Sequence, residues 1–108
     1  MLPKKNRVDK KSVGLIFKKR SFIVSPSFTF KFILSNTHFQ PRISFIAPKN
    51  IAKLAVKRNL LRRKGYSALE KHINQFPLGI MGVFVFKKVE ENVSKIEDEI
   101  KNILNKVN

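Results

Sequence analysis

The sequence contains no cysteine and no tryptophan. Without cysteine the chain can form neither a disulfide framework nor a thiolate zinc site, and it has no cysteine nucleophile, which fits a reducing compartment. It also contains no run that approaches the roughly 20 apolar residues needed to span a bilayer, and its start is too charged for a secretory signal. We therefore expect a soluble cytoplasmic protein with no membrane partner.

Catalytic constellations are missing as well. The only two histidines, His38 and His72, are expected to have no carboxylate beside them, and the acids at 97–99 are expected on the solvent side of the last helix. The four glycines do not form a phosphate-binding loop. We therefore expect no catalytic residue and no metal ligand in this chain, which favours a binding protein over a polypeptide that is catalytic alone.

Acidic side chains are scarce. The chain has 7 Asp and Glu against 23 Lys and Arg, which gives a formal net charge of +16 on 108 residues. Residues 1–74 carry this whole excess, whereas residues 75–108 hold equal numbers of acids and bases. Positive charge concentrated in this way marks a nucleic acid or an anionic membrane as the partner. Length and composition suffice for a single domain over 1–108, with 1–8 as a flexible basic N-terminus.

The spacing of apolar residues predicts an α+β chain. Runs with alternating apolar residues indicate strands, and apolar residues repeated every three or four positions indicate helices. We expect a two-layer α/β sandwich with a four-stranded, mostly antiparallel sheet and helices on one face. The expected strands lie at 22–25, 28–35, 42–47 and 80–86, and the expected helices lie around 13–17 and at 53–63, 66–75 and 93–107, with a break at Gly65.

Three phenylalanines, Phe28, Phe30 and Phe32, alternate along one expected strand. Such a row can stack unpaired bases, as in sheet-type RNA-binding proteins, or it can pack under the helices. We favour packing, because ten phenylalanines and no tryptophan must fill a small core. Thr29 and Lys31 then face the other way, and Lys31 joins the basic surface.

The helix expected at 53–63 gathers its polar side chains on one side. At about 100° per residue they fall within an arc of roughly 140°. Guanidinium groups offer planar, bidentate donors for phosphate oxygens, and an asparagine adds a donor and an acceptor for a base edge. Charge alone leaves open the alternative of a merely solvated basic face. The arc consists of Arg58, Asn59, Arg62 and Arg63, and the residues expected to rest on the core beside it are Leu54, Val56, Leu60 and Leu61.

The segments Lys49-Asn50, Ala55-Val56-Lys57-Arg58-Asn59 and Arg62-Arg63 follow the third expected strand, and in this order they resemble the arginine-and-asparagine motif of the protein subunit of bacterial ribonuclease P. The resemblance implies a protein that assists a catalytic RNA in the endonucleolytic removal of the 5′ leader from precursor tRNA. In that family the RNA supplies the active site and holds the Mg²⁺ ions, and no protein partner is required. The residues that would bind the ribonuclease P RNA are Lys53, Arg58, Asn59, Arg62 and Arg63.

The resemblance also implies a second surface, a cleft between the first helix and the exposed face of the sheet, which receives the single-stranded leader. It further implies a left-handed βαβ crossover, which general handedness rules would oppose. Val13 and Leu60 depart from the family pattern, because an aromatic residue and a basic residue are common there. The residues that would line the cleft are Phe17, Thr29, Lys31, Ser44 and Ile46.

Two other classes of protein have similar compositions. A small ribosomal protein would also be basic and would bind one ribosomal RNA site without any role in tRNA processing. A membrane-surface protein would need a broad apolar face beside its basic helix, which this sequence lacks. Affinity for precursor over mature tRNA separates the first reading from both alternatives.

Overall fold

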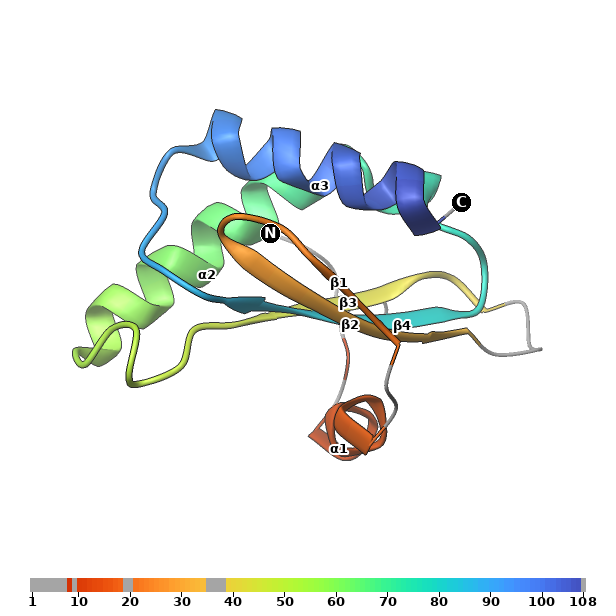
Figure 1. The fold of residues 1–108 in the computed structure, drawn as a ribbon, viewed down its shortest axis with the longest axis horizontal. Helices are drawn as coiled ribbons and strands as arrows, with labels where there is room; N and C mark the ends of the chain where they lie inside the picture. Colours follow the sequence, from red (N-terminus) through yellow and green to blue (C-terminus); the bar gives the residue numbers. More distant parts are fainter. Residues whose placement is uncertain (1–7, 9, 19–20, 35–38, 108) are drawn as a thin grey trace.

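A four-stranded sheet with helices on both sides forms the molecule (Figure 1). The computed structural model describes residues 8, 10–18, 21–34 and 39–107. In chain order the elements are α1 (Lys10–Lys18), β1 (Phe22–Val24), β2 (Phe28–Leu34), β3 (Arg42–Ile46), α2 (Ala55–Leu69), the short 3₁₀ helix η2 (Ile73–Gln75), β4 (Ile80–Phe86) and α3 (Val93–Val107).

The sheet has the strand order β1-β2-β4-β3. β2 pairs antiparallel with both β1 and β4, whereas β3 pairs parallel with β4. The predicted α+β sandwich with a mostly antiparallel sheet is therefore confirmed, and its strand polarity is mixed. The parallel pair is joined through α2, which makes β3-α2-β4 a βαβ unit, and its left-handedness stays a prediction.

The helices divide between the two faces of the sheet. α2 and α3 lie together over one face, whereas α1 lies on the opposite side (Figure 1). The expectation of helices on one face thus holds for α2 and α3 only. The opposite placement of α1 leaves part of the second sheet face open to a ligand.

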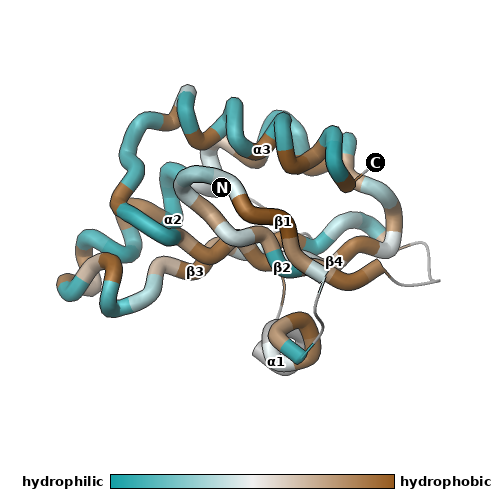
Figure 2. The backbone as a smooth tube through the Cα atoms, viewed as in Figure 1, coloured by the Kyte–Doolittle hydropathy of each residue, from teal (hydrophilic) through white to brown (hydrophobic). Residues whose placement is uncertain are grey.

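The main core lies between the sheet and the helices α2 and α3. Phe28 and Phe30 are completely buried, and Phe32 packs against the same core, so these rings pack under the helices as predicted. Phe84, on the central strand β4, stacks on Phe45 at 4.9 Å between ring centroids. Figure 2 shows α3 alternating between hydrophilic and hydrophobic residues along its length, which matches its apolar stripe facing the sheet.

Two expectations for α2 are wrong. The helix does not end before Gly65 but continues to Leu69, because the absent side chain of Gly65 lets α2 approach the ring of Phe45 closely. Leu54 and Val56 do not rest on the core, since they are 73% and 77% exposed. The helix instead packs through its second half, with Leu61, Tyr66, Ala68 and Leu69 buried.

The acids of α3 also differ from expectation. Glu99 accepts hydrogen bonds from the Ser25 hydroxyl at 2.6 Å and from the Ser27 N–H at 2.7 Å, so it fastens the β1–β2 turn to α3. His72 does have a carboxylate partner, because its Nε2 lies 3.3 Å from an oxygen of Glu97. Both contacts join residues far apart in the sequence, which is why local pattern did not reveal them. His38 lies outside the described residues.

Candidate nucleic-acid interface

The first three turns of α2 carry the predicted basic arc. The helix begins after Leu54, whose side chain makes no capping hydrogen bond, and its first turn contains no acid. The first N–H groups of a helix have no partner within the helix, and with the helix dipole they favour an anion. This end of α2 therefore adds its own donors to those of the arginines.

Arg58 is fixed against the bend that precedes the helix. Its Nη1 donates to the carbonyl of Ala52 at 3.0 Å and to the carbonyl of Lys53 at 2.7 Å. These bonds orient the guanidinium plane before any ligand arrives and leave its remaining N–H groups for a phosphate. The predicted site residue Lys53 thus lies outside the helix, where its exposed side chain adds charge and its carbonyl positions Arg58.

Arg62 is fixed in a similar way, but against the sheet. Its Nε donates to the carbonyl of Phe45 on β3 at 3.2 Å, and this leaves the terminal nitrogens of the guanidinium free for a ligand. Tyr66, one turn further along, is buried, and its hydroxyl accepts the N–H of Phe45 at 3.2 Å. β3 therefore supports the arginine face of α2 at a single residue.

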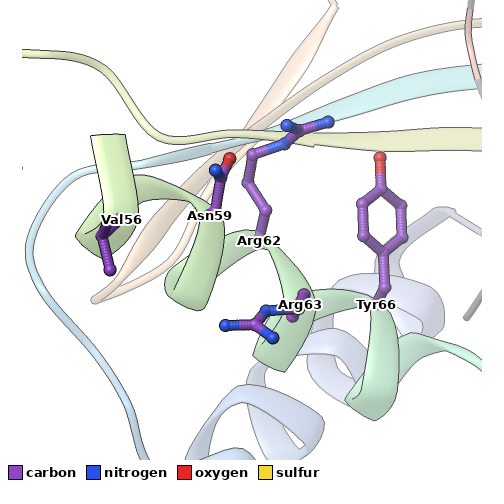
Figure 3. A pocket seen from close by; sticks show the side chains of 5 residues that line it. All are labelled: Val56, Asn59, Arg62, Arg63 and Tyr66. Carbon is purple, nitrogen blue, oxygen red and sulfur yellow. The ribbon is translucent and has the colours of Figure 1, made fainter. Parts of the chain in front are cut away.

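Asn59 and Arg63 complete the arc. Asn59 is exposed. Together with Arg62 it lines two shallow surface depressions. Figure 3 shows Arg62 directed toward β3 and Arg63 directed away from it. The larger depression has a volume of about 440 Å³ and is lined by Val56, Asn59, Arg62, Arg63 and Tyr66.

Lys57 does not belong to the arc. It forms a salt bridge of 2.8 Å with Glu91, which precedes α3. The hydrogen bond from Lys57 and the positive charges of Lys57 and Lys64 lower the pKa of Glu91 below its usual range. Lys57 is therefore ion-paired within the protein, and the arc consists of Arg58, Asn59, Arg62 and Arg63.

The predicted leader cleft lies on the opposite face of the sheet. Cross-strand register aligns Lys31, Val83 and Ser44 in one row, and Thr29, Val85 and Ile46 in the next. Residues in register share a face, and this is the face that contacts α1. The four predicted strand residues, Thr29, Lys31, Ser44 and Ile46, are thus brought together.

Phe17 reaches this face from α1. Its ring is 42% exposed, and the Lys31 Nζ lies 4.6 Å from the ring centroid. A cation over an aromatic face is held by the ring quadrupole. The pair places a flat apolar surface beside a positive charge, which suits a base and its phosphate.

Ser44 is committed to the N-terminal segment. Its hydroxyl accepts the N–H of Val8 at 2.8 Å and donates to the carbonyl of Val8 at 3.3 Å. Because Ser44 is buried, it positions the chain near the cleft rather than presenting a hydroxyl to a ligand. Residues 1–7 of the expected flexible N-terminus lie outside the described residues, but Val8 is held.

Sequence reasoning missed one strand of this surface. β1 extends the two rows, since Phe22 pairs with Lys31 and Val24 pairs with Thr29. Both side chains are about half exposed, at 56% and 50%. Alternation along β1 together with the Ser-Pro-Ser turn that follows it was the available signal, because these two features set the register against β2.

The arrangement supplies groups that can bind a polyanion. In the described part of the chain, no three His, Cys, Asp or Glu side chains gather where they could hold a metal ion. None of the described helices is long and apolar enough to cross a membrane. A basic, partly preorganised helix on one side and an aromatic, basic sheet face on the other define an RNA-binding protein of the α+β class.

Comparison with known proteins assigns the family. The chain matches the family model for ribonuclease P over residues 2–108. It therefore belongs to the ribonuclease P protein family, whose members are the protein subunit of the ribonuclease P endoribonuclease. Membership implies a ribonuclease P RNA as the partner and disfavours the ribosomal alternative. No curated protein matches the chain.

Solved structures agree in fold. The RNase P protein of Staphylococcus aureus superimposes with a TM-score of 0.78 at 16% identity, over 94% of each chain. The RNase P protein of Thermotoga maritima also gives 0.78, at 18% identity, over 94% of this chain and 97% of that one. A structure of the latter protein in complex with 1-(4-fluorophenyl)-2-thiourea gives 0.76 at 18% identity, over 92% and 96%. At these identities the likeness concerns the fold.

Proposed function

We propose that this ribonuclease P protein binds its catalytic RNA through the basic arc of α2 and the single-stranded 5′ leader of precursor tRNA through the cleft beside α1. One observation carries the proposal: the two surfaces lie on opposite sides of the same strand. Arg62 is anchored to the carbonyl of Phe45, while the neighbouring Ser44 and Ile46 belong to the cleft row. A rigid β3 then fixes the distance between the bound RNA and the bound leader.

In this proposal the chemistry belongs to the RNA. When bound by the RNA, Mg²⁺ would supply the activated water and the charge stabilisation for phosphodiester hydrolysis. The polypeptide binds and orients, and its excess charge lowers the repulsion between two polyanions that must lie together. Removal of the leader yields the mature 5′ end of the tRNA.

The contacts of α2 suit a folded RNA. Arg58 and Arg62 already donate hydrogen bonds to backbone carbonyls, which restrict their side chains. Less conformational entropy is therefore lost when their other N–H groups bind a phosphate. Asn59, exposed between them, offers a donor and an acceptor for a base edge or a sugar hydroxyl. The proposed RNA-binding set is Lys53, Arg58, Asn59, Arg62 and Arg63.

The cleft suits an extended single strand. Phe17 offers a ring for stacking, and Lys31 offers a charge for the adjoining phosphate. Thr29 and Ile46 form the floor in the neighbouring row. Since a mature tRNA has no leader, these contacts are made by the precursor only.

Equilibrium binding to the reconstituted holoenzyme tests this proposal. We expect the holoenzyme to bind precursor tRNA more tightly than mature tRNA, and we expect the difference to shrink when Phe17 is replaced by alanine. Equal affinity for both tRNAs, with the protein folded and bound to its RNA, would contradict leader recognition. The ribosomal alternative predicts such equality.

A further inference from the structure

Two of the ten phenylalanines are exposed. All ten lie in the described part of the chain, and Phe17 and Phe22 are the ones on the surface, at 42% and 56% exposure. Exposed aromatic rings lose the hydrophobic stabilisation that burial would give them. Phe17 is accounted for by the leader cleft, whereas Phe22 is not.

Phe22 belongs to the same face of the sheet as Phe17. It pairs with Lys31 in the register of β1 and β2, and directly opposed side chains have their Cβ atoms about 4.5–5.5 Å apart. The Lys31 Nζ lies in turn 4.6 Å from the centre of the Phe17 ring. Lys31 therefore adjoins two exposed aromatic residues, one on the helix and one on the strand.

The surroundings favour a polyanion over an apolar partner. Lys31 is the immediate neighbour of both rings, and Lys18 is exposed next to Phe17 at the end of α1. The described cleft residues Phe17, Thr29, Lys31, Ser44 and Ile46 include no acid. A protein surface that docked here through Phe22 and Val24 would have to desolvate the lysine, whereas a nucleic acid would neutralise it.

We propose that Phe22 is a second base-stacking platform of the leader cleft, for an unpaired nucleotide whose phosphate is bound by Lys31. The inference rests on the proposed function and adds a residue on β1 to it. Base stacking needs only a π-face, so this contact tolerates any base and gives affinity more than sequence preference. It extends the surface open to the leader from α1 and β2 to the edge strand of the sheet.

Substitutions at Phe22 separate stacking from apolar burial. Phe22→Leu keeps an apolar side chain but removes the aromatic face, and Phe22→Tyr keeps the face. With the holoenzyme and a precursor tRNA, we expect Phe22→Leu to weaken binding roughly tenfold and Phe22→Tyr to bind like the wild type. Leu34→Ala is the matched control, because Leu34 is equally exposed, at 57%, at the end of β2.

Fluorescence of 2-aminopurine gives a direct reading of the contact. The base is placed at one leader position at a time, and the position that stacks on Phe22 shows quenching with wild type and with Phe22→Tyr but not with Phe22→Leu. Binding of mature tRNA and of the ribonuclease P RNA should be unchanged in Phe22→Leu, as should its melting temperature.

Several outcomes overturn the inference. If wild type prefers the precursor and Phe22→Leu binds it equally well, Phe22 does not stack and the proposed function stands. If Phe22→Leu also has a lower melting temperature or a lower affinity for the ribonuclease P RNA, Phe22 has a structural role. If sedimentation shows a wild-type dimer that Phe22→Leu dissociates, the surface around Phe22 on β1 binds a second copy of the chain. If wild type itself shows no preference for the precursor, the proposed function fails and the inference fails with it.

Discussion

Gly65 of α2 faces the ring of Phe45 on β3 so closely that a Cβ atom on the glycine would lie 2.6 Å from two ring carbons. The ring has no room to retreat, because Phe45 is 1% exposed and contacts the rings of Tyr66 and Phe84. This approach sets how closely the basic helix rests on the sheet. It also brings Arg62 within reach of the Phe45 carbonyl.

Gly65→Ala should destabilise the fold. Alanine is the better helix former by roughly 1 kcal/mol, but overpacking at a buried ring costs about 1–3 kcal/mol, so the clash prevails. Chemical denaturation measures the difference. Gly14→Ala is the control, because nothing lies within 4 Å of its Cβ position, and this substitution should stabilise α1. A Gly65→Ala protein as stable as wild type would contradict the packing account.

Arg62→Lys should weaken RNA binding although the charge is kept. Lysine cannot hold the Phe45 carbonyl and present a planar fork at the same time. Arg63 makes no hydrogen bond within the described structure, so Arg63→Lys should cost less. Salt titration adds a second reading: Arg62→Ala should reduce the slope of log affinity against log salt by about 0.7–0.9, and Arg62→Lys should leave it nearly unchanged. Equal losses of RNA affinity in Arg62→Lys and Arg63→Lys would show that the hydrogen bond from Arg62 to the Phe45 carbonyl has no role in binding.

Ser44→Ala should release Val8. The substitution removes two hydrogen bonds between the Ser44 hydroxyl and the Val8 backbone, each worth about 0.5–1.5 kcal/mol. Amide hydrogen exchange at Val8 should therefore accelerate, while Ser44→Thr, which keeps the hydroxyl, should exchange like wild type. Ser67→Ala, at an exposed position of α2, is the control for loss of a serine. Unchanged exchange in Ser44→Ala would contradict this tether.

Lys57→Met should raise the pKa of Glu91 toward its usual value of 4.5, because the hydrogen bond and the charge of Lys57 keep it lowered. A lowered pKa in the folded state means that the carboxylate form is favoured by folding. The pair therefore stabilises the fold above the unfolded pKa, and this contribution is lost as the pH falls through the folded pKa. NMR titration of the Glu91 carboxyl carbon measures the shift, and high salt should reduce it more in wild type than in Lys57→Met, where only the charge of Lys64 remains as a cause. A Glu91 pKa that does not respond to Lys57→Met would exclude Lys57 as its cause.

Local pattern was sufficient for most of the fold. Alternation in β2, together with ten phenylalanines to place in a small core, predicted the burial of Phe28 and Phe30. The periodicity of the last segment predicted a helix that the structure has at Val93–Val107. The basic arc of α2 was also predictable, because it depends only on the 100° step between residues. Thr29 and Lys31 followed from the same alternation once the packing of the phenylalanines was chosen.

Tertiary contacts account for what the sequence did not reveal. A glycine within a helical pattern predicts the end of the helix. The close packing of Gly65 against Phe45 explains why α2 continues through this residue. Leu54 and Val56 read as core residues, but the helix rests on the sheet through its second half. Phe22 faces the cleft because β1 pairs with β2, which the alternation along β1 and the turn after it indicate only when they are considered together.

Cleavage of precursor tRNA at low magnesium by the chain reconstituted with its ribonuclease P RNA tests the central claim most directly. We expect wild type to stimulate cleavage, and we expect the double variant Arg58→Ala/Arg62→Ala to lose the stimulation while it stays folded. This result would identify α2 as the route by which the protein assists its RNA. An absence of stimulation by folded wild-type protein with its own RNA, or full stimulation by the double variant, would contradict the account.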